Sequence, residues 1–201
     1  MAKSTLNSWF RTEPEHEQLV KRHAVVGQLK AVQANRLRQD RLTKKIHDDA
    51  VDEMQGLIGD GLSERELFLT GLALYWAEGN KTQNHLAIAN CDPQLIRTFT
   101  LWVERCLRID RSRLRGMVYL YADVDVDAAE TYWSEVIGIP RSQFYPAQVD
   151  TRTNKSSEKY GTLIYGTVHV KVLGEGTSNL HRKIMGWIAG LGQHIKQTMR
   201  E

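Results

Sequence analysis

Cysteine is scarce in this chain, and long apolar runs are missing. Cys91 and Cys106 are the only two cysteines, and no histidine lies at zinc-finger spacing from them, which argues against a disulfide framework and a structural zinc site. No apolar run reaches about 18 residues, and the N-terminus lacks the apolar segment of a signal peptide. We therefore expect a cytoplasmic protein that does not span a membrane.

Basic and acidic residues are nearly equal in number in this chain. Lys and Arg number 27 against 24 Asp and Glu, so the net charge of +3 does not by itself indicate a polyanionic partner. Hydrophobic residues make up 41% of the 201 residues, enough for one sizeable core with an appendage or for two small domains. The positions of the charges carry more information than their sum.

Positive charge is concentrated between Leu19 and Ile46. This span lies in a longer segment, from about Glu13 to Leu57, that is rich in helix-forming residues and has no proline after Pro14. We predict one long helix or a broken pair of helices there. Charge of this density favours nucleic acid through phosphate contacts. Within the span the only acid is Asp40, and the basic residues are Lys21, Arg22, Lys30, Arg36, Arg38, Arg41, Lys44 and Lys45.

The same helical segment has a second interpretation. Val25, Val32 and Ile46 fit a loose heptad repeat, which Gln39 interrupts. A heptad is typical of helices that pair with one another, so a self-association arm is the alternative to a nucleic-acid-binding arm. Residues 58–61 then read as a linker, and we predict a helical arm over residues 1–60 and an α/β domain over residues 61–201.

An uncharged run from Leu67 to Ala77 organises the second part of the chain. Ser63 and Glu66 form a capping box before it, and Gly79 suits a left-handed stop after it. A helix that is apolar all round is an interior helix, so we expect both of its faces to be buried. At about 100° per residue those faces are Thr70, Ala73 and Ala77 on one side and Leu69, Leu72 and Trp76 roughly opposite.

Residues 69–79, LTGLALYWAEG, resemble the signature helix of the LAGLIDADG family, which comprises homing endonucleases and their non-cleaving relatives. Small residues and a terminal acid followed by glycine, Glu78-Gly79, carry the resemblance. The acid is Glu where Asp is more frequent, and its interval from Gly71 is longer than usual. Lys81 after the glycine and the later segments NCDP, YW, IP and YGT are similar to a prokaryotic subgroup that is often fused to a helix-turn-helix.

The resemblance implies an α+β fold, with a LAGLIDADG-like domain whose curved antiparallel sheet lies under helices and follows the long basic arm. It implies double-stranded DNA as the partner. Residues 3–11, KSTLNSWFR, resemble the tail of a recognition helix in a truncated helix-turn-helix. A short N-terminal turn held by Trp9 is an equal alternative for that segment.

The resemblance also implies a nuclease site at Glu78. This carboxylate would bind Mg²⁺, and Lys81 would neutralise charge on the scissile phosphate. One Glu per chain is too few for such a site, so a homodimer would bring two copies of Glu78 together. The chains would dock through small residues of the signature helix, namely Thr70, Gly71, Ala73 and Ala77.

Alternating segments downstream predict a half-buried sheet. His85–Asn90, Arg113–Ala122 and Tyr160–Val172 read as strands, with helices at Pro93–Arg108, at Ala128–Ile137 and from about Asn179 against the sheet. One sheet face is basic with interleaved aromatics, and in the family such a face lies in the DNA major groove. The residues expected to contact nucleic acid there are Arg113, Arg115, Tyr119, Tyr121, Arg152, Lys155, Lys159, Tyr165, His169 and Lys171.

Three aspartates, Asp123, Asp125 and Asp127, begin like a calcium-binding loop. The glycine and glutamate that such a loop needs are replaced by Ala128 and Ser134, so we predict helix capping instead. Three functions remain. We favour a non-cleaving, sequence-specific DNA-binding protein or regulator over a Mg²⁺-dependent homing endonuclease acting as a homodimer. An RNA-binding or assembly protein is the third possibility.

Overall fold

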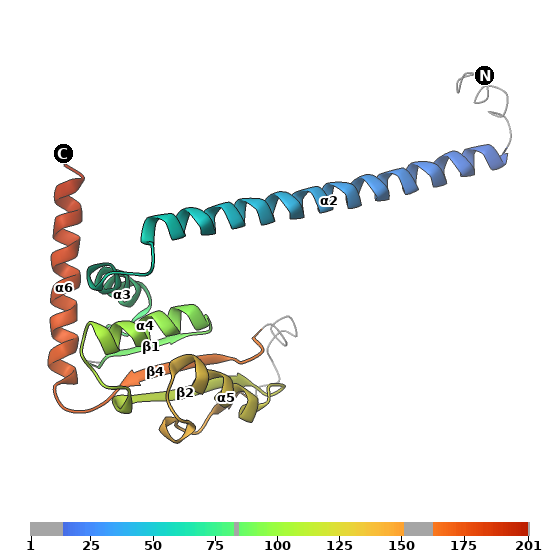
Figure 1. Cartoon of the computed structure of the whole chain (residues 1–201). Helices are drawn as coiled ribbons and strands as arrows, with labels where there is room; N and C mark the ends of the chain where they lie inside the picture. The colour runs from blue at the N-terminus through green and yellow to red at the C-terminus, as the bar shows by residue number, and fades with distance from the viewer. Residues whose placement is uncertain (1–13, 83–84, 151–162, 201) are drawn as a thin grey trace. The chain divides into compact units, whose positions relative to one another are not determined.

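A computed structural model describes residues 14–82, 85–150 and 163–200 (Figure 1). The chain divides into two compact units, Met1–Gly61 and Leu62–Glu201. The segment KSTLNSWFR lies outside the described residues, so the helix-turn-helix hypothesis stays a prediction.

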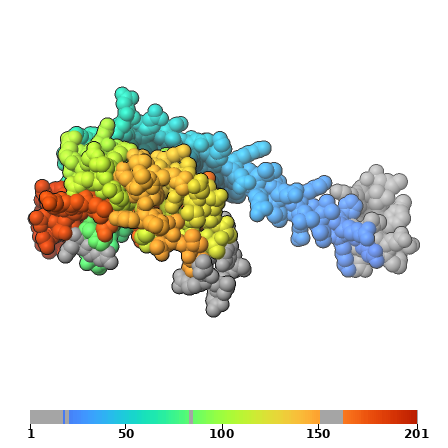
Figure 2. Space-filling view, turned by 90° about the horizontal axis from the view of Figure 1, so that it is seen from below, coloured from blue at the N-terminus to red at the C-terminus, as the bar shows by residue number. Residues whose placement is uncertain are grey.

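The first unit consists of one helix, α2, Pro14–Ile58. Proline suits the first position of a helix, where its missing N–H group has no acceptor to lose. The predicted helix is thus present as one unbroken element of 45 residues, about 68 Å long at 1.5 Å per residue. Its side chains from residue 21 to residue 57 are all exposed. Figure 2 shows the side chains of α2, in blue, standing out along the rod.

The second unit is an α+β domain around a four-stranded sheet in the order β1-β4-β2-β3. The strands are β1, Ala87–Asn90; β2, Leu114–Tyr121; β3, Gln148–Asp150; and β4, Thr167–Val172. The helices are α3, Glu64–Glu78; α4, Pro93–Arg105; α5, Val126–Ile137; and α6, Thr177–Thr198, with short 3-10 turns at Arg111–Arg113 and Arg141–Gln143.

The sheet is mixed, which corrects the expected antiparallel sheet. β4 pairs antiparallel with β1 and β2, but β2 pairs parallel with β3. The chain leaves β2, crosses over through α5 and returns at the edge in the direction of β2, as a strand–helix–strand crossover requires. The strand expected from Tyr160 begins only at Thr167, because a turn with Gly166 at φ +63° precedes it. Ile164 lies before this turn and is 71% exposed.

Helices cover one face of this sheet. Figure 1 shows α4 and α5 on the same side of the strands, with α3 beside α4 and α6 beside α3. The alternation predicted for β2 is observed, since Leu114, Val118 and Leu120 point into the core. The core between sheet and helices contains Tyr75, Phe99, Trp102 and Trp133, all at most 1% exposed.

Only one face of α3 is buried, so the expectation of two buried faces is wrong. Ser63 and Glu66 form the predicted capping box, and Leu67, Gly71, Leu72 and Tyr75 pack inward. On the other face Leu69 and Trp76 are about 40% exposed. The reason is that α4, α6 and β1 all pack on one side of the helix.

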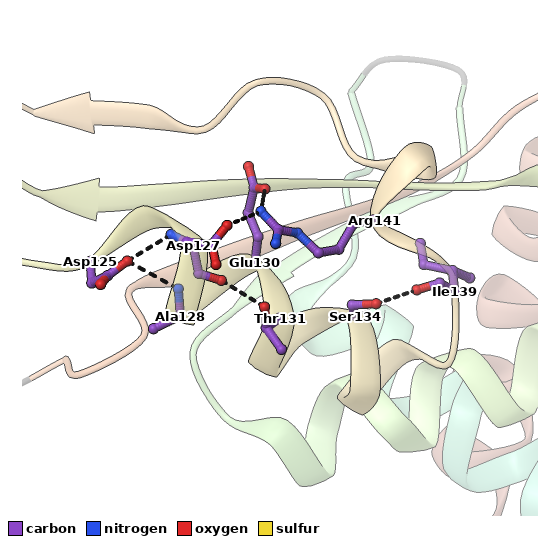
Figure 3. Close-up of polar contacts among 8 residues, drawn as sticks. All are labelled: Asp125, Asp127, Ala128, Glu130, Thr131, Ser134, Ile139 and Arg141. Carbon is purple, nitrogen blue, oxygen red and sulfur yellow. Dashed lines mark hydrogen bonds and ion pairs between the residues drawn. The ribbon is translucent and has the colours of Figure 1, made fainter.

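Helix α5 begins as the aspartates predict. The Asp125 carboxylate accepts hydrogen bonds from the backbone N–H groups of Asp127 and Ala128 (Figure 3). Arg141, after the helix, forms ion pairs with Asp127 at 2.6 Å and Glu130 at 2.9 Å. These contacts fix the start of α5 and the turn after it. Asp125 thus caps the helix, and Asp127 forms an ion pair.

Two helices end or pack differently from the prediction. α4 stops at Arg105 rather than Arg108, because Arg108 has φ +56° and cannot continue a right-handed helix. α6 begins at Thr177 and packs mainly on α3, whereas the helix from about Asn179 was expected against the sheet. The rings of Phe68 and Trp187 lie 5.1 Å apart in an edge-to-face contact there, while Ile195 near the end of α6 remains 45% exposed.

Candidate nucleic-acid interface

The sheet face opposite the helices, here called the open face, presents side chains in register across the strands. Residues directly opposite each other on paired strands point to the same side of a sheet. The rows of the open face are Ala87, Lys171 and Arg115; then Ala89, His169 and Met117; then Thr167, Tyr119 and Gln148; and last Tyr121 with Asp150. The open face is therefore basic at one end, aromatic in the middle and acidic at the other end.

His169 is the titratable group at the centre of the open face. Its ring lies 4.3 Å from the ring of Tyr119. Burial lowers the pKa of His169 from its ordinary value of 6.5. The imidazole is consequently neutral at pH 7 and offers hydrogen bonding and stacking rather than charge.

The two arginines predicted to contact nucleic acid at the start of β2, Arg113 and Arg115, both donate hydrogen bonds to backbone carbonyls. Arg115 donates from Nη1 to the carbonyls of Ser112 and Leu114, both at 2.7 Å. Arg113 lies in the 3-10 turn before β2 and donates to the carbonyls of Leu173 and Glu175, at 2.7 and 3.0 Å. Arg115 stays on the open face, whereas the Arg113 guanidinium holds the loop between β4 and α6.

Tyr165 does not lie in the rows of the open face. It precedes β4, and its ring stacks on Tyr132 of α5 with centroids 3.9 Å apart. Its carbonyl accepts a hydrogen bond from Nε1 of Trp133 at 2.7 Å. Tyr165 therefore belongs to the helix side of the sheet. Three further predicted contacts, Arg152, Lys155 and Lys159, lie outside the described residues.

The end of α3 meets the open face at a shallow hollow. Glu78, Lys81 and Ala89 line this hollow together with His169. The Lys81 ammonium donates to the carbonyls of Trp76 at 2.8 Å and Ala77 at 3.3 Å, so it caps the last turn of α3. Among the lining residues Glu78 is the only carboxylate.

Gly79 is needed at this corner for space rather than for its backbone angles. Its φ is −69°, an extended conformation, so the predicted left-handed stop is wrong. The residue is buried and bridges to Ile88 of β1, and a Cβ there would come within 2.5 Å of the Tyr75 carbonyl and closer still to the Tyr75 ring. A glycine lets the helix end lie directly against the sheet.

Two buried side chains fix the turn after Gly79. The Tyr75 hydroxyl donates to the carbonyl of Asn80, and Nε2 of His181, from α6, lies 3.1 Å from the same oxygen. Burial raises the pKa of Tyr75 to about 12, so its hydroxyl stays protonated and can donate. Sequence reasoning missed this arrangement, because His181 is remote in sequence from Asn80 and no local pattern marks the pair.

Five of the eight basic residues between Leu19 and Ile46 lie on one face of α2. At about 100° per residue, Lys30, Arg38, Arg41, Lys44 and Lys45 fall within an arc of about 120°. Arg36 lies on the opposite side. Lys44 forms an exposed ion pair with Asp48 at 3.3 Å, so four cations of this arc carry no ion pair among the described residues. We call these five residues the basic face of α2.

The hollow contains one of the carboxylates that the predicted Mg²⁺ site would need. Mg²⁺ is usually held by one or two carboxylates together with substrate phosphates and waters. The hollow supplies the Glu78 carboxylate, and the described residues contain no group of three or more His, Cys, Asp or Glu side chains suited to a metal. A second chain would have to supply the other carboxylate.

The docking residues expected on α3 are divided between its faces. Thr70, Ala73 and Ala77 are exposed. Gly71 faces inward, where the Trp102 indole of α4 lies so close that a Cβ on Gly71 would overlap it. Gly71 thus serves packing within the chain. Leu69 and Trp76 lie beside Thr70, Ala73 and Ala77 on one exposed face of α3, which corrects the expectation that they lie on opposite sides.

None of the described helices is both long enough and apolar enough to cross a membrane. Comparisons of the chain with protein-family models, with curated proteins and with solved structures gave no match.

Proposed function

We propose that this chain is a DNA-binding protein that recognises duplex DNA without cutting it. The observation that carries the proposal is the basic face of α2, where five exposed cations share one side of a helix. Phosphates lie along both strands of a duplex, and each lysine or arginine that contacts one releases condensed counterions. A long helix with such a face suits that backbone.

The open face of the sheet supports the same proposal. Polar side chains that can read base edges or stack, including Tyr119, Tyr121 and His169, lie next to the cations Arg115 and Lys171. No described helix of this unit covers them. Phosphate contacts give affinity and position, whereas contacts to base edges give sequence preference. In this proposal α2 supplies the first and the open face the second.

Cleavage is the second candidate, favoured by one observation. Glu78, the acid at the end of α3, lines the hollow that reaches His169 on the open face, where a bound backbone would pass. Cutting would require two chains, joined through the exposed face of α3, to bring two Glu78 carboxylates to one metal site. We rank binding without cleavage first because Glu78 is the one carboxylate among the described residues that line the hollow.

A salt titration of duplex binding tests the main proposal. We compare the full chain with an Arg38→Gln/Arg41→Gln variant and with Arg97→Gln, an exposed arginine of α4, as the control. Each lost phosphate contact should reduce the slope of log affinity against log salt by about 0.9. The control should leave the slope unchanged. Absence of duplex binding at low salt, or preference for a structured RNA competitor, would contradict the proposal.

Selection from a random duplex pool separates binding from cleavage. Retention and strand breaks are scored with Mg²⁺ and again with chelator. An enriched site without breaks supports the binding protein. Breaks that disappear with chelator and with Glu78→Gln, while affinity persists, would establish the endonuclease instead.

A further inference from the structure

Helix α2 exposes a series of large apolar side chains along its length. Val25, Leu29, Val32 and Ile46 are each between 54% and 64% exposed, and Leu57 is 80% exposed. A 45-residue helix whose described side chains from 21 to 57 are all exposed gains no burial of its own. Most helical stability in proteins comes from packing an apolar face, so α2 needs a partner.

The spacing of these side chains identifies the kind of partner. Steps of four and three residues alternate along one side of α2, which is the heptad spacing of two helices packed knobs-into-holes. We call this side the seam. Its positions are Arg22, Val25, Leu29, Val32, Arg36, Gln39, Thr43, Ile46, Ala50, Glu53 and Leu57. The seam is thus mostly apolar toward both ends and polar at the centre.

We propose that α2 pairs with α2 of a second copy of this chain as an antiparallel two-stranded coiled coil. With the twofold axis between Leu37 and Arg38, most seam positions face a residue of like or complementary chemistry, the exceptions being Val32 against Thr43 and Leu57 against Gln18. Leu29 of one copy then faces Ile46 of the other, and Val25 faces Ala50. At the polar centre of the seam, Arg36 of each copy faces Gln39 of the other. Near each end Arg22 faces Glu53, an ion pair formed twice.

Charge decides between this arrangement and a parallel pair. In a parallel pair each seam residue faces its own copy, so Arg36 would meet Arg36 and Glu53 would meet Glu53. Like charges in such positions are destabilising. Moving the antiparallel register by one heptad would place Glu53 against Leu29. The register with its axis between Leu37 and Arg38 therefore avoids like-charge contacts along the seam.

The remaining charges of α2 agree with the pairing. Lys30, Arg38, Arg41, Lys44 and Lys45 occupy the positions that point away from the partner in a two-stranded coiled coil. The basic face of α2 consequently stays available on both sides of the pair. The pairing does not depend on DNA binding, and it uses a surface other than the exposed face of α3.

Sedimentation of the full chain over a range of concentrations tests the pairing. We expect a dimer for the wild type and loss of the dimer for Leu29→Gln/Ile46→Gln. The matched control, Arg38→Gln/Arg41→Gln, makes the same kind of change on the outward side and should remain dimeric. Tryptophan fluorescence checks that the second unit of each variant is folded, since four of the five tryptophans lie there.

A charge exchange tests orientation and register. Glu53→Arg alone places an arginine opposite Arg22 of the partner and should weaken the dimer by tenfold or more. Adding Arg22→Glu restores opposite charges and should restore the dimer. In a parallel pair neither change brings opposite charges together, so restoration is specific to the antiparallel register.

Three results would overturn the inference. The first is a wild-type chain that stays monomeric at every concentration. The second is a dimer that survives Leu29→Gln/Ile46→Gln but is lost on Ala73→Glu, which would place the contact on α3. The third is a dimer that Glu53→Arg leaves unchanged. DNA binding is measured separately, so failure of the pairing and failure of the proposed function are distinguishable.

Discussion

The contact between Gly71 of α3 and Trp102 of α4 gives the sharpest test of the fold. Trp102 is fully buried, and a Cβ on Gly71 would lie 2.6 Å from the Trp102 Cβ and closer still to two atoms of the indole. Such distances require the indole or a backbone to move. Gly71→Ala should therefore destabilise the second unit, although alanine normally favours a helix.

A matched substitution isolates the size of this effect. Gly186 lies inside α6, where a Cβ would meet nothing within 4 Å. Gly186→Ala should stabilise by about 0.5–1 kcal/mol through helix propensity. Gly71→Ala receives the same gain and carries an overpacking cost, typically about 1–3 kcal/mol. The difference between the two variants thus equals the overpacking cost, which we place at about 3 kcal/mol because the neighbour is a rigid, buried ring.

Urea unfolding followed by tryptophan fluorescence measures that difference. Four of the five tryptophans belong to the second unit, so the signal reports on the domain that contains both glycines. Gly71→Ala should lower the urea midpoint and Gly186→Ala should raise it, with the slope unchanged. Equal rises in both midpoints would refute the close packing of α3 on Trp102.

Three further predictions concern polar groups of the second unit. Burial lowers the pKa of His169 below 6.5 in the folded state, so the unfolded chain binds the proton more readily. The contribution of neutral His169 to the free energy of unfolding is fully present above about pH 6.5 and is lost as the pH falls below that value. The urea midpoints of the wild type and of His169→Gln, compared across this pH range, should therefore diverge. Tyr75→Phe removes a buried donor to the Asn80 carbonyl and should cost about 1 kcal/mol in the same unfolding assay. Asp125→Ala removes the cap of α5 and should cost about 1 kcal/mol at neutral pH, and a variant as stable as the wild type would argue against the capping bonds.

Local patterns were sufficient for most elements of this chain. Helix formers without proline predict one long helix or a broken pair from about Glu13 to Leu57, and the single helix α2 is observed there. The Ser63–Glu66 pair predicts the start of α3, and strict alternation predicts β2. Each of these signals acts within a few residues, through capping bonds, backbone preference or side-chain direction. Such local constraints can be predicted from the sequence alone.

Tertiary structure decided what lies against each element. An uncharged helix can be buried on one side or on all sides, and only the placement of α4, α6 and β1 leaves Leu69 and Trp76 of α3 exposed. The parallel pairing of β3 depends on the direction in which the chain returns from α5.

The corner at Glu78 shows the same division. Sequence alone determined an acid and a glycine at the end of a helix, but the role of Gly79 depends on Tyr75 and β1, and the turn after it depends on His181. Contacts between residues far apart in the chain have no local pattern, because they are selected by shape and by hydrogen-bond partners that only the folded chain brings together.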